Sequence, residues 1–211
     1  ICTDATVQYI YVVTTKNEIL SFYPPTLGFE NKGILSCPAS GGATPFSMAV
    51  DRKGVAYVLY NDGELFEVAL KDLSCKKSPF KSATSTFNNF GMGFAAESDG
   101  SETLYIAAAD DPSTLAKFAL PSYALTGIGT LVGISRPELT GTGAGQLFGF
   151  WANPEGGSGV GAFDKKTAKV LERVDLPSVE QGMGWAFAFW GGDFYLFTAP
   201  GGSSSEVTRY R

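Results

Sequence analysis

The chain has 211 residues, including 26 glycines, with 13% aromatic and 18% charged residues and a net charge of −5. This profile is typical of many short strands joined by tight turns. Lys and Arg form no cluster of the size that follows a phosphate backbone, so we expect no nucleic-acid partner. No stretch has the apolar length of a transmembrane helix. The chain contains no histidine, which excludes Ser-His-Asp and Cys-His catalysis, and we expect no metal and no cofactor.

A short strand pattern, with aromatic and aliphatic residues at alternate positions, returns about every 46 residues. Its five copies are marked by Tyr11, Tyr57, Tyr105, Gly149 and Leu196, at steps of 46, 48, 44 and 47 residues. One four-stranded blade of a β-propeller takes roughly 40–50 residues. We therefore predict an all-β, five-bladed β-propeller, a single domain over residues 1–211. The predicted blades are approximately 1–40, 41–84, 85–133, 134–180 and 181–211.

The strands of each blade follow from alternating runs separated by turn residues. In chain order they are 9–15, 18–23 and 29–35; 45–51, 55–61, 64–70 and 75–81; 90–96, 103–109, 115–120 and 124–131; 139–145, 147–153, 160–164 and 170–176; and 185–190, 194–199 and 207–211. The first blade thus lacks an innermost strand and the last lacks an outer one. We expect both blades to be incomplete in this chain and a missing C-terminal segment to complete the ring, since closure removes exposed strand edges.

The innermost strands of three blades alternate large and small residues, as in residues 90–94 (FGMGF). The matching strand of the fourth blade is thin and polar, with TGTG at residues 140–143. It either opens the central channel on one side, or a neighbouring bulky side chain fills the gap, which is the interpretation that we prefer. The glycine-rich residues 141–145 lack the Gly-Lys-Ser/Thr end of a phosphate loop and indicate a close-packed strand.

The three cysteines are Cys2, Cys37 and Cys75, and none lies in a CxxC pair. Cys37 and Cys75 follow the outer regions of adjacent blades, so we predict a disulfide between them and an oxidising compartment. The alternative is three buried free thiols. We expect Cys2 to pair with a cysteine in the missing C-terminal segment.

Four carboxylates beside proposed innermost strands are candidates for glycoside hydrolysis, which needs one carboxyl group with a raised pKa and a second as base or nucleophile. They are Asp51, Glu97, Glu138 and Asp193. The two aspartates and Glu97 are better explained by turns, where such side chains bond the local backbone. Only Glu138 has no ready turn role, and we predict no catalytic residues.

The candidate ligand-binding residues lie on the polar strand of the fourth blade and at the start of the fifth. They are Glu138, Thr140, Thr142 and Trp185. Exposed tryptophans can stack on sugars, although core packing is the simpler explanation for Trp151 and Trp190, and also for Trp185. Oxygen ligands for calcium could come from Asp62 and from residues 110–111, but no repeated DxDxDG spacing supports this, and solvated turns are favoured.

Several runs of the sequence resemble a family of secreted bacterial β-propeller lipoproteins of the myxobacterial type. These runs are CTDAT (2–6), GATPFSMAVDRKGVAYVLYNDGELFEV (42–68), FGMGF (90–94), ELTGTGAGQLFGF (138–150) and WAFAFWGGDFYLF (185–197). The resemblance implies an exported protein, tethered by a lipid on an upstream cysteine, with a further cysteine in a C-terminal strand. It implies no catalytic residues, because the family has no assigned activity.

We therefore expect a non-enzymatic, exported binding or assembly module, with a protein or glycan ligand, at the cell surface, in the periplasm or outside the cell. Propeller faces are platforms for such contacts, although a fold alone does not name a function. Two alternatives remain open at this point: a glycoside hydrolase-like enzyme that uses the axial carboxylates, and a structural subunit of a surface assembly.

Overall fold

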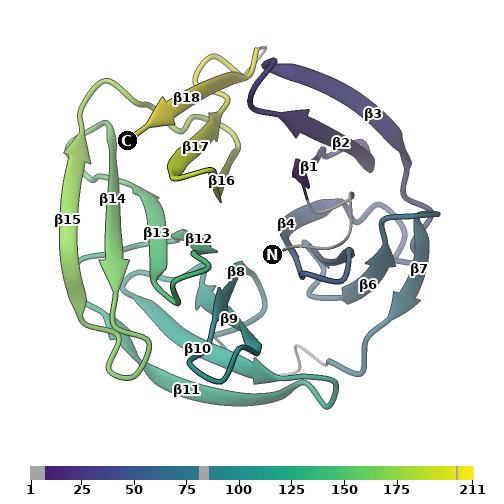
Figure 1. Ribbon diagram of the computed structural model, residues 1–211, viewed down its shortest axis with the longest axis horizontal. Coiled ribbons are helices and arrows are strands. Elements are labelled where there is room, and N and C mark those ends of the chain that lie inside the picture. The colour runs from purple at the N-terminus through teal and green to yellow at the C-terminus, as the bar shows by residue number, and fades with distance from the viewer. Residues whose placement is uncertain (1–7, 81–85, 203) are drawn as a thin grey trace. The chain divides into compact units, whose positions relative to one another are not determined.

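The computed structural model describes residues 8–80, 86–202 and 204–211. Within them, eighteen strands form five antiparallel sheets, and the strands of each sheet are neighbours in the order in which they occur along the chain. Figure 1 shows these successive sheets. Consecutive antiparallel strands repeated as separate sheets are the blades of a β-propeller, so the predicted all-β, five-bladed fold is confirmed.

The chain divides into two compact units, Ile1–Asn89 and Phe90–Arg211. The first unit holds two sheets: β1 (Ile10–Val13), β2 (Glu18–Tyr23) and β3 (Gly28–Ile34); then β4 (Pro45–Val50), β5 (Val55–Tyr60), β6 (Leu65–Ala69) and β7 (Ser74–Lys77). These are the first and second blades.

The second unit holds the other three blades. They are β8 (Phe90–Ala96), β9 (Glu102–Ala108), β10 (Ser113–Ala119) and β11 (Ala124–Leu131); β12 (Glu138–Gly141), β13 (Leu147–Ala152), β14 (Ser158–Phe163) and β15 (Val170–Leu176); and β16 (Trp185–Trp190), β17 (Asp193–Thr198) and β18 (Glu206–Tyr210). Every strand expected from the sequence is present, and most differ from their predicted bounds by one or two residues.

The first and last blades, which the sequence predicts to be incomplete, each form a regular antiparallel sheet of three strands within the described residues. The three blades between them have four strands each. Cys2 lies outside the described residues, and its pairing with a cysteine of a further C-terminal segment stays a prediction.

The polar strand of the fourth blade is shorter than its sequence indicates. β12 ends at Gly141, and a tight turn follows, in which the Thr142 amide donates to the Gln146 carbonyl at 2.9 Å and the Gly145 amide donates to the Thr142 carbonyl at 3.0 Å. The glycines predicted to extend the strand therefore form the turn instead. The hydroxyl of Thr142 accepts the Gln146 amide at 3.2 Å and fixes that turn.

Within the second unit, β12 packs directly against β8 through glycine. A Cβ atom at Gly93 would lie 2.7 Å from the Leu139 carbonyl carbon, and one at Gly141 would overlap the Phe94 carbonyl oxygen. Such distances require hydrogen in place of a side chain. The predicted close packing of this strand is thus confirmed, but the gap is closed by neighbouring backbone rather than by a bulky side chain.

Candidate functional site

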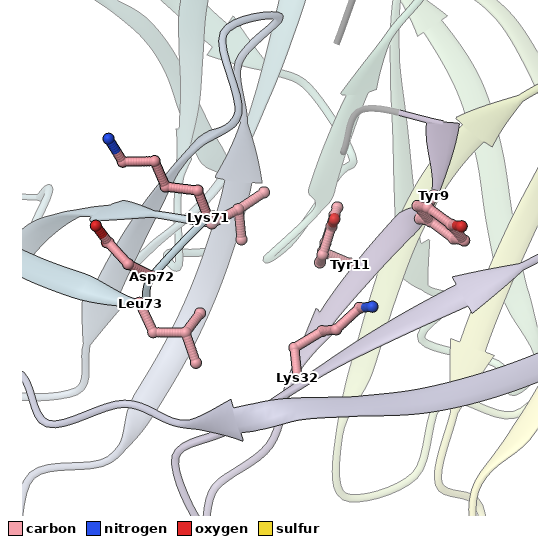
Figure 2. Close-up of a pocket in the computed structure, with 7 residues that line it drawn as sticks. Tyr9, Tyr11, Lys32, Lys71, Asp72 and Leu73 are labelled. Atoms are coloured by element: carbon pink, nitrogen blue, oxygen red, sulfur yellow. The ribbon is translucent and has the colours of Figure 1, made fainter. Parts of the chain in front are cut away.

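A cavity of about 420 Å³ lies between the first and second sheets of the unit Ile1–Asn89 (Figure 2). This volume falls within the roughly 300–1,000 Å³ typical of small-molecule sites. One wall is formed by Tyr9, Tyr11 and Lys32 and the other by the turn residues Leu70, Lys71, Asp72 and Leu73. Figure 2 shows Tyr11 and Lys32 on one side and Lys71 and Leu73 across from them.

The first wall presents aromatic rings beside a cation. Tyr11 lies on β1, and Tyr9 lies in the bend just before this strand. Their ring centroids are 6.5 Å apart in an edge-on arrangement. The Lys32 ammonium lies 5.7 Å from the centroid of the Tyr9 ring and 2.8 Å from the carboxylate of Glu30. The Tyr9 ring also lies 5.4 Å from the Tyr23 ring, and Tyr11 packs against buried residues of both blades. This wall therefore offers the remaining ring surfaces, their polar tips and a positive charge.

The second wall is the tight turn between β6 and β7. The Leu73 amide donates to the Ala69 carbonyl at 2.8 Å, and Leu73 adopts a positive φ of 57°. Leu70 is buried, whereas Lys71 is exposed. Asp72 accepts hydrogen bonds from the Ser74 hydroxyl at 2.6 Å and the Ser74 amide at 3.0 Å, and these bonds lower the pKa of this exposed carboxyl group. The turn thus carries one ammonium group and one ionised carboxylate.

A disulfide joins the two walls. Cys37, three residues after the end of β3, is bonded to Cys75 on β7, so the predicted pairing is confirmed. The Tyr60 hydroxyl also donates to the Asn17 side-chain oxygen at 2.9 Å, which ties the second sheet to the first. A Cβ atom at Gly33 would lie 2.7 Å from the Leu73 side chain, so β3 and the turn are in close contact.

Apolar packing supports the same pair of sheets. One buried cluster contains residues from both blades: Ile19, Leu35, Ala56, Val58, Tyr60, Phe66, Val68 and Leu70. Leu70 belongs both to this core and to the lining of the cavity. The cavity is therefore a preformed feature of a packed, cross-linked pair of blades, which lowers the ordering cost of binding a ligand.

The residues predicted from sequence to bind a ligand have packing and turn roles in the second unit. The Thr140 hydroxyl accepts the Phe189 amide at 3.1 Å and so joins β12 to β16. Thr142 is buried in its own turn. Glu138 begins β12, where it is paired with Phe150 on β13. β12 and β16 are in contact, so the structure brings Glu138 and Thr140 close to the strand of Trp185.

Trp185 has one unusual property among these residues. It begins β16 and packs against the cluster formed by Phe150, Val160, Phe187 and Leu196. Its indole nitrogen is buried without a hydrogen-bond partner in the described part of the chain. The Trp151 ring is buried, with its indole nitrogen donating to Asn153 at 3.1 Å. Both tryptophans therefore contribute to the core, as the sequence favours.

The candidate carboxylates are engaged in structural contacts. Asp51 accepts the amides of Lys53 at 2.8 Å and Val55 at 2.9 Å, as expected for a turn. Asp193 is not in the preceding turn as predicted but is the buried first residue of β17. It is paired with Arg211 at 2.9 Å and Arg209 at 3.4 Å.

Glu97 joins the third and fourth blades within their unit. It accepts the Tyr105 hydroxyl at 2.8 Å and the Lys165 ammonium at 3.0 Å. Partial burial by itself would raise the pKa of Glu97, but the hydrogen bonds from Lys165, Tyr105 and Thr103 together lower it. Burial, followed by the bond to Glu97, raises the pKa of the Tyr105 hydroxyl. A lowered pKa is the reverse of what a general acid in glycoside hydrolysis needs.

Acidic and cysteine side chains do not gather into a metal site: no group of three or more His, Cys, Asp or Glu that could hold an ion occurs among the residues described. Asp62, considered as a calcium ligand, accepts the Glu64 amide at 3.0 Å and the Ser40 amide at 3.2 Å.

We find no helix in the described ranges that is long and apolar enough to cross a membrane.

Sequence reasoning did not identify the residues that line the cavity. Tyr9 and Tyr11 belong to the repeated strand pattern, and the pattern of Lys71 and Asp72 is that of an ordinary solvated turn. Neither pattern distinguishes these residues from other strand and turn residues of the chain.

Comparison with known proteins supports the fold and goes no further. Neither family models nor curated protein sequences match the chain. Among solved structures, the chain is similar to a protein of unknown function from Bacteroides caccae, with a TM-score of 0.53 and 14% sequence identity. The similarity covers 96% of this chain and 72% of that one. At this level of identity it establishes a shared architecture only.

Proposed function

We propose that this protein is a non-enzymatic, exported binding module that holds a saccharide in the cavity between its first and second blades. The cavity is the observation that carries the proposal. It combines the volume of a small-molecule site with two tyrosines, two lysines and one aspartate on facing walls. Aromatic faces pack on the apolar faces of sugar rings, while the polar tips bond the hydroxyl groups.

The rigidity of the two walls supports binding as the role of this site. The disulfide Cys37–Cys75 and the bond from Tyr60 to Asn17 hold the sheets together without any ligand. A preformed site loses little conformational entropy when it is filled. The disulfide also supports export, because such bonds persist in oxidising compartments. The resemblance to secreted propeller lipoproteins also supports export. We include in the proposal a lipid anchor upstream of this chain.

A role without catalysis is supported by the contacts of the acidic residues. Asp51, Glu97 and Asp193 are each held by backbone amides or cations. The cavity itself contains one carboxylate, Asp72, and it is hydrogen-bonded to Ser74. Glycoside hydrolysis needs two carboxyl groups facing one bond, and this lining provides a single one.

A glycan array with the wild-type protein and two variants tests the proposal. We expect wild-type protein to bind a defined set of saccharides and Tyr11→Ala to lose them. Phe29→Ala is the matched control, since Phe29 is an exposed aromatic residue of the same sheet that does not line the cavity. Circular dichroism checks that each variant is folded. If Tyr11→Ala does not fold, Tyr11→Phe replaces it and tests the contribution of the hydroxyl group alone.

Two results would overturn the proposal. Folded wild-type protein that binds no saccharide would remove the ligand class, and binding that survives in Tyr11→Ala would remove the site. Incubation with the bound saccharides, followed by chromatography, checks the absence of turnover, since release of product would make the protein an enzyme.

A further inference from the structure

We propose that the cavity between β1, β3 and the turn Leu70–Leu73 selects an acidic saccharide, a sugar ring that carries a negatively charged substituent paired with Lys71. This inference rests on the proposed function, because it names the ligand class of the same site. It begins from the charge of the lining, which holds two ammonium groups and one carboxylate in a chain whose net charge is −5.

Lys71 is the cation available to a ligand. It is exposed and takes part in no ion pair within residues 8–80, 86–202 and 204–211. Its neighbour Asp72 directs one carboxylate oxygen to both the amide and the hydroxyl of Ser74. The charge of Lys71 also helps to lower the pKa of Asp72. Figure 2 shows the Lys71 ammonium directed away from Tyr11 and Lys32, so this exposed side chain must turn toward an anionic group that enters the cavity.

Lys32 places a second ammonium group at a fixed position, where its charge is paired with the Glu30 carboxylate. Its ammonium lies over the Tyr9 ring at 5.7 Å and beside Glu30 at 2.8 Å, and its side chain is 30% exposed. Glu30 does not line the cavity, whereas Lys32 does. The Tyr9 ring and the Glu30 carboxylate thus hold the Lys32 side chain in place. Little of its conformational entropy therefore remains to be lost when a ligand binds.

The two tyrosines give the reason for a sugar ring rather than a bare anion. Their hydroxyl groups can donate to and accept from ring substituents, and their faces can cover apolar C–H groups. Leu70 and Leu73 extend the apolar surface across the cavity. A small inorganic anion would leave this surface and most of the volume of about 420 Å³ unused. One or two sugar units with a single anionic substituent match the chemistry of both walls.

Matched pairs of glycosides test the inference by isothermal titration calorimetry. The probes are methyl glucoside and methyl glucuronide, methyl galactoside and methyl galacturonide, and the corresponding 6-sulfates. We expect the acidic member of at least one pair to bind roughly 2- to 5-fold more tightly, as for an exposed ion pair. The carboxylate and sulfate arms decide which anionic group is preferred. The advantage should shrink as salt is added, because exposed charges are screened.

Lys71→Gln and Lys53→Gln form the variant pair. Both lysines are exposed and lie in turns of the same unit, but only Lys71 lines the cavity. We expect Lys71→Gln to abolish the preference for the acidic glycoside and Lys53→Gln to retain it. Removal of one exposed charge leaves the core intact, so loss of folding is not expected.

The outcomes separate this inference from the proposed function. Equal affinity for the acidic and neutral members, or a preference unchanged by Lys71→Gln, would overturn the acidic-saccharide assignment and leave a neutral-saccharide site standing. Absence of binding by all probes would also overturn it. The proposed function falls with it only when the glycan array is negative as well.

Discussion

Two contacts between neighbouring blades use different means to hold sheets together. The first and second blades share an apolar cluster and are joined by the disulfide Cys37–Cys75, and a cavity lies between them. The third and fourth blades also share a buried cluster, which includes Leu139 and Trp151. Their first strands approach so closely that Gly93 and Gly141 leave no room for a side chain.

The difference shows where this molecule can hold a ligand. Where glycine allows backbone to meet backbone, the contact is filled and the stability comes from packing. Between the first and second blades, a cavity lined by Tyr9, Tyr11 and Lys32 remains beside the shared apolar cluster, and a covalent bond joins the two sheets. The disulfide and the cavity are thus complementary features of one contact.

The largest expected effect is on the cross-linked contact. The double variant Cys37→Ser/Cys75→Ser should lower the free energy of unfolding by about 3–4 kcal/mol, because the bond closes a loop with a sequence separation of 38 residues. Denaturant unfolding of wild-type and variant protein measures the loss. A loss below about 1 kcal/mol would show that packing alone holds these sheets, since the entropic model of a loop this long predicts far more.

The next effect is on the close-packed contact. Gly141→Ala should destabilise the protein by about 1–3 kcal/mol, since the new methyl group overlaps backbone of β8 that cannot turn away. Gly143→Ala is the matched control two residues away, where nothing lies within 4 Å of the added carbon. Chemical denaturation should separate the two variants, and equal stabilities would refute the close approach of β8 and β12.

A smaller effect concerns the ion pair between the third and fourth blades. Lys165→Met should cost about 1–2 kcal/mol, since Glu97 and Tyr105 lose a partly buried partner. Lys166→Met, one residue further on and exposed, should change the thermal midpoint little. If both variants melt alike, the Lys165–Glu97 pair contributes nothing to this contact.

The smallest effect is the pH dependence of the same pair. The pKa of Glu97 is lowered from its usual 4.5 in the folded protein. Its contribution to stability is therefore complete above pH 4.5 and is lost as the pH falls through the lower, folded-state pKa. Unfolding measured on the acid side of pH 4.5 should show a shallower loss of stability in Glu97→Gln than in wild type. Parallel curves would contradict the assignment.

The fold is more accessible from sequence than the site, and particular residues show why. Strand alternation and the turn residues between the alternating runs are local signals, so each predicted strand is present. Cys37 and Cys75 could be paired because the 46-residue repeat places them on adjacent blades. The cavity, in contrast, joins Tyr9, Tyr11, Lys32 and residues 70–73. No local pattern indicates which turn of one blade will face which strand of the next.

Two polar residues that the sequence predicts to bind a ligand have structural roles instead. Thr140 and Thr142 are unusual for an innermost strand, but their hydroxyl groups accept backbone amides from Phe189 and Gln146. Their polarity is explained by hydrogen bonds within the fold. The sequence shows which residue types a strand contains, but it does not show which backbone amides will lie within hydrogen-bonding distance of their side chains.

The most direct test of the central claim is a titration of isotope-labelled protein with methyl glucuronide, followed by amide chemical shifts. The account predicts that the shifts that move belong to Tyr9, Tyr11, Lys32 and residues 70–73. Shifts confined to β12 and β16, around Glu138, Thr140 and Trp185, would contradict it and return the binding site to the strands of the fourth and fifth blades.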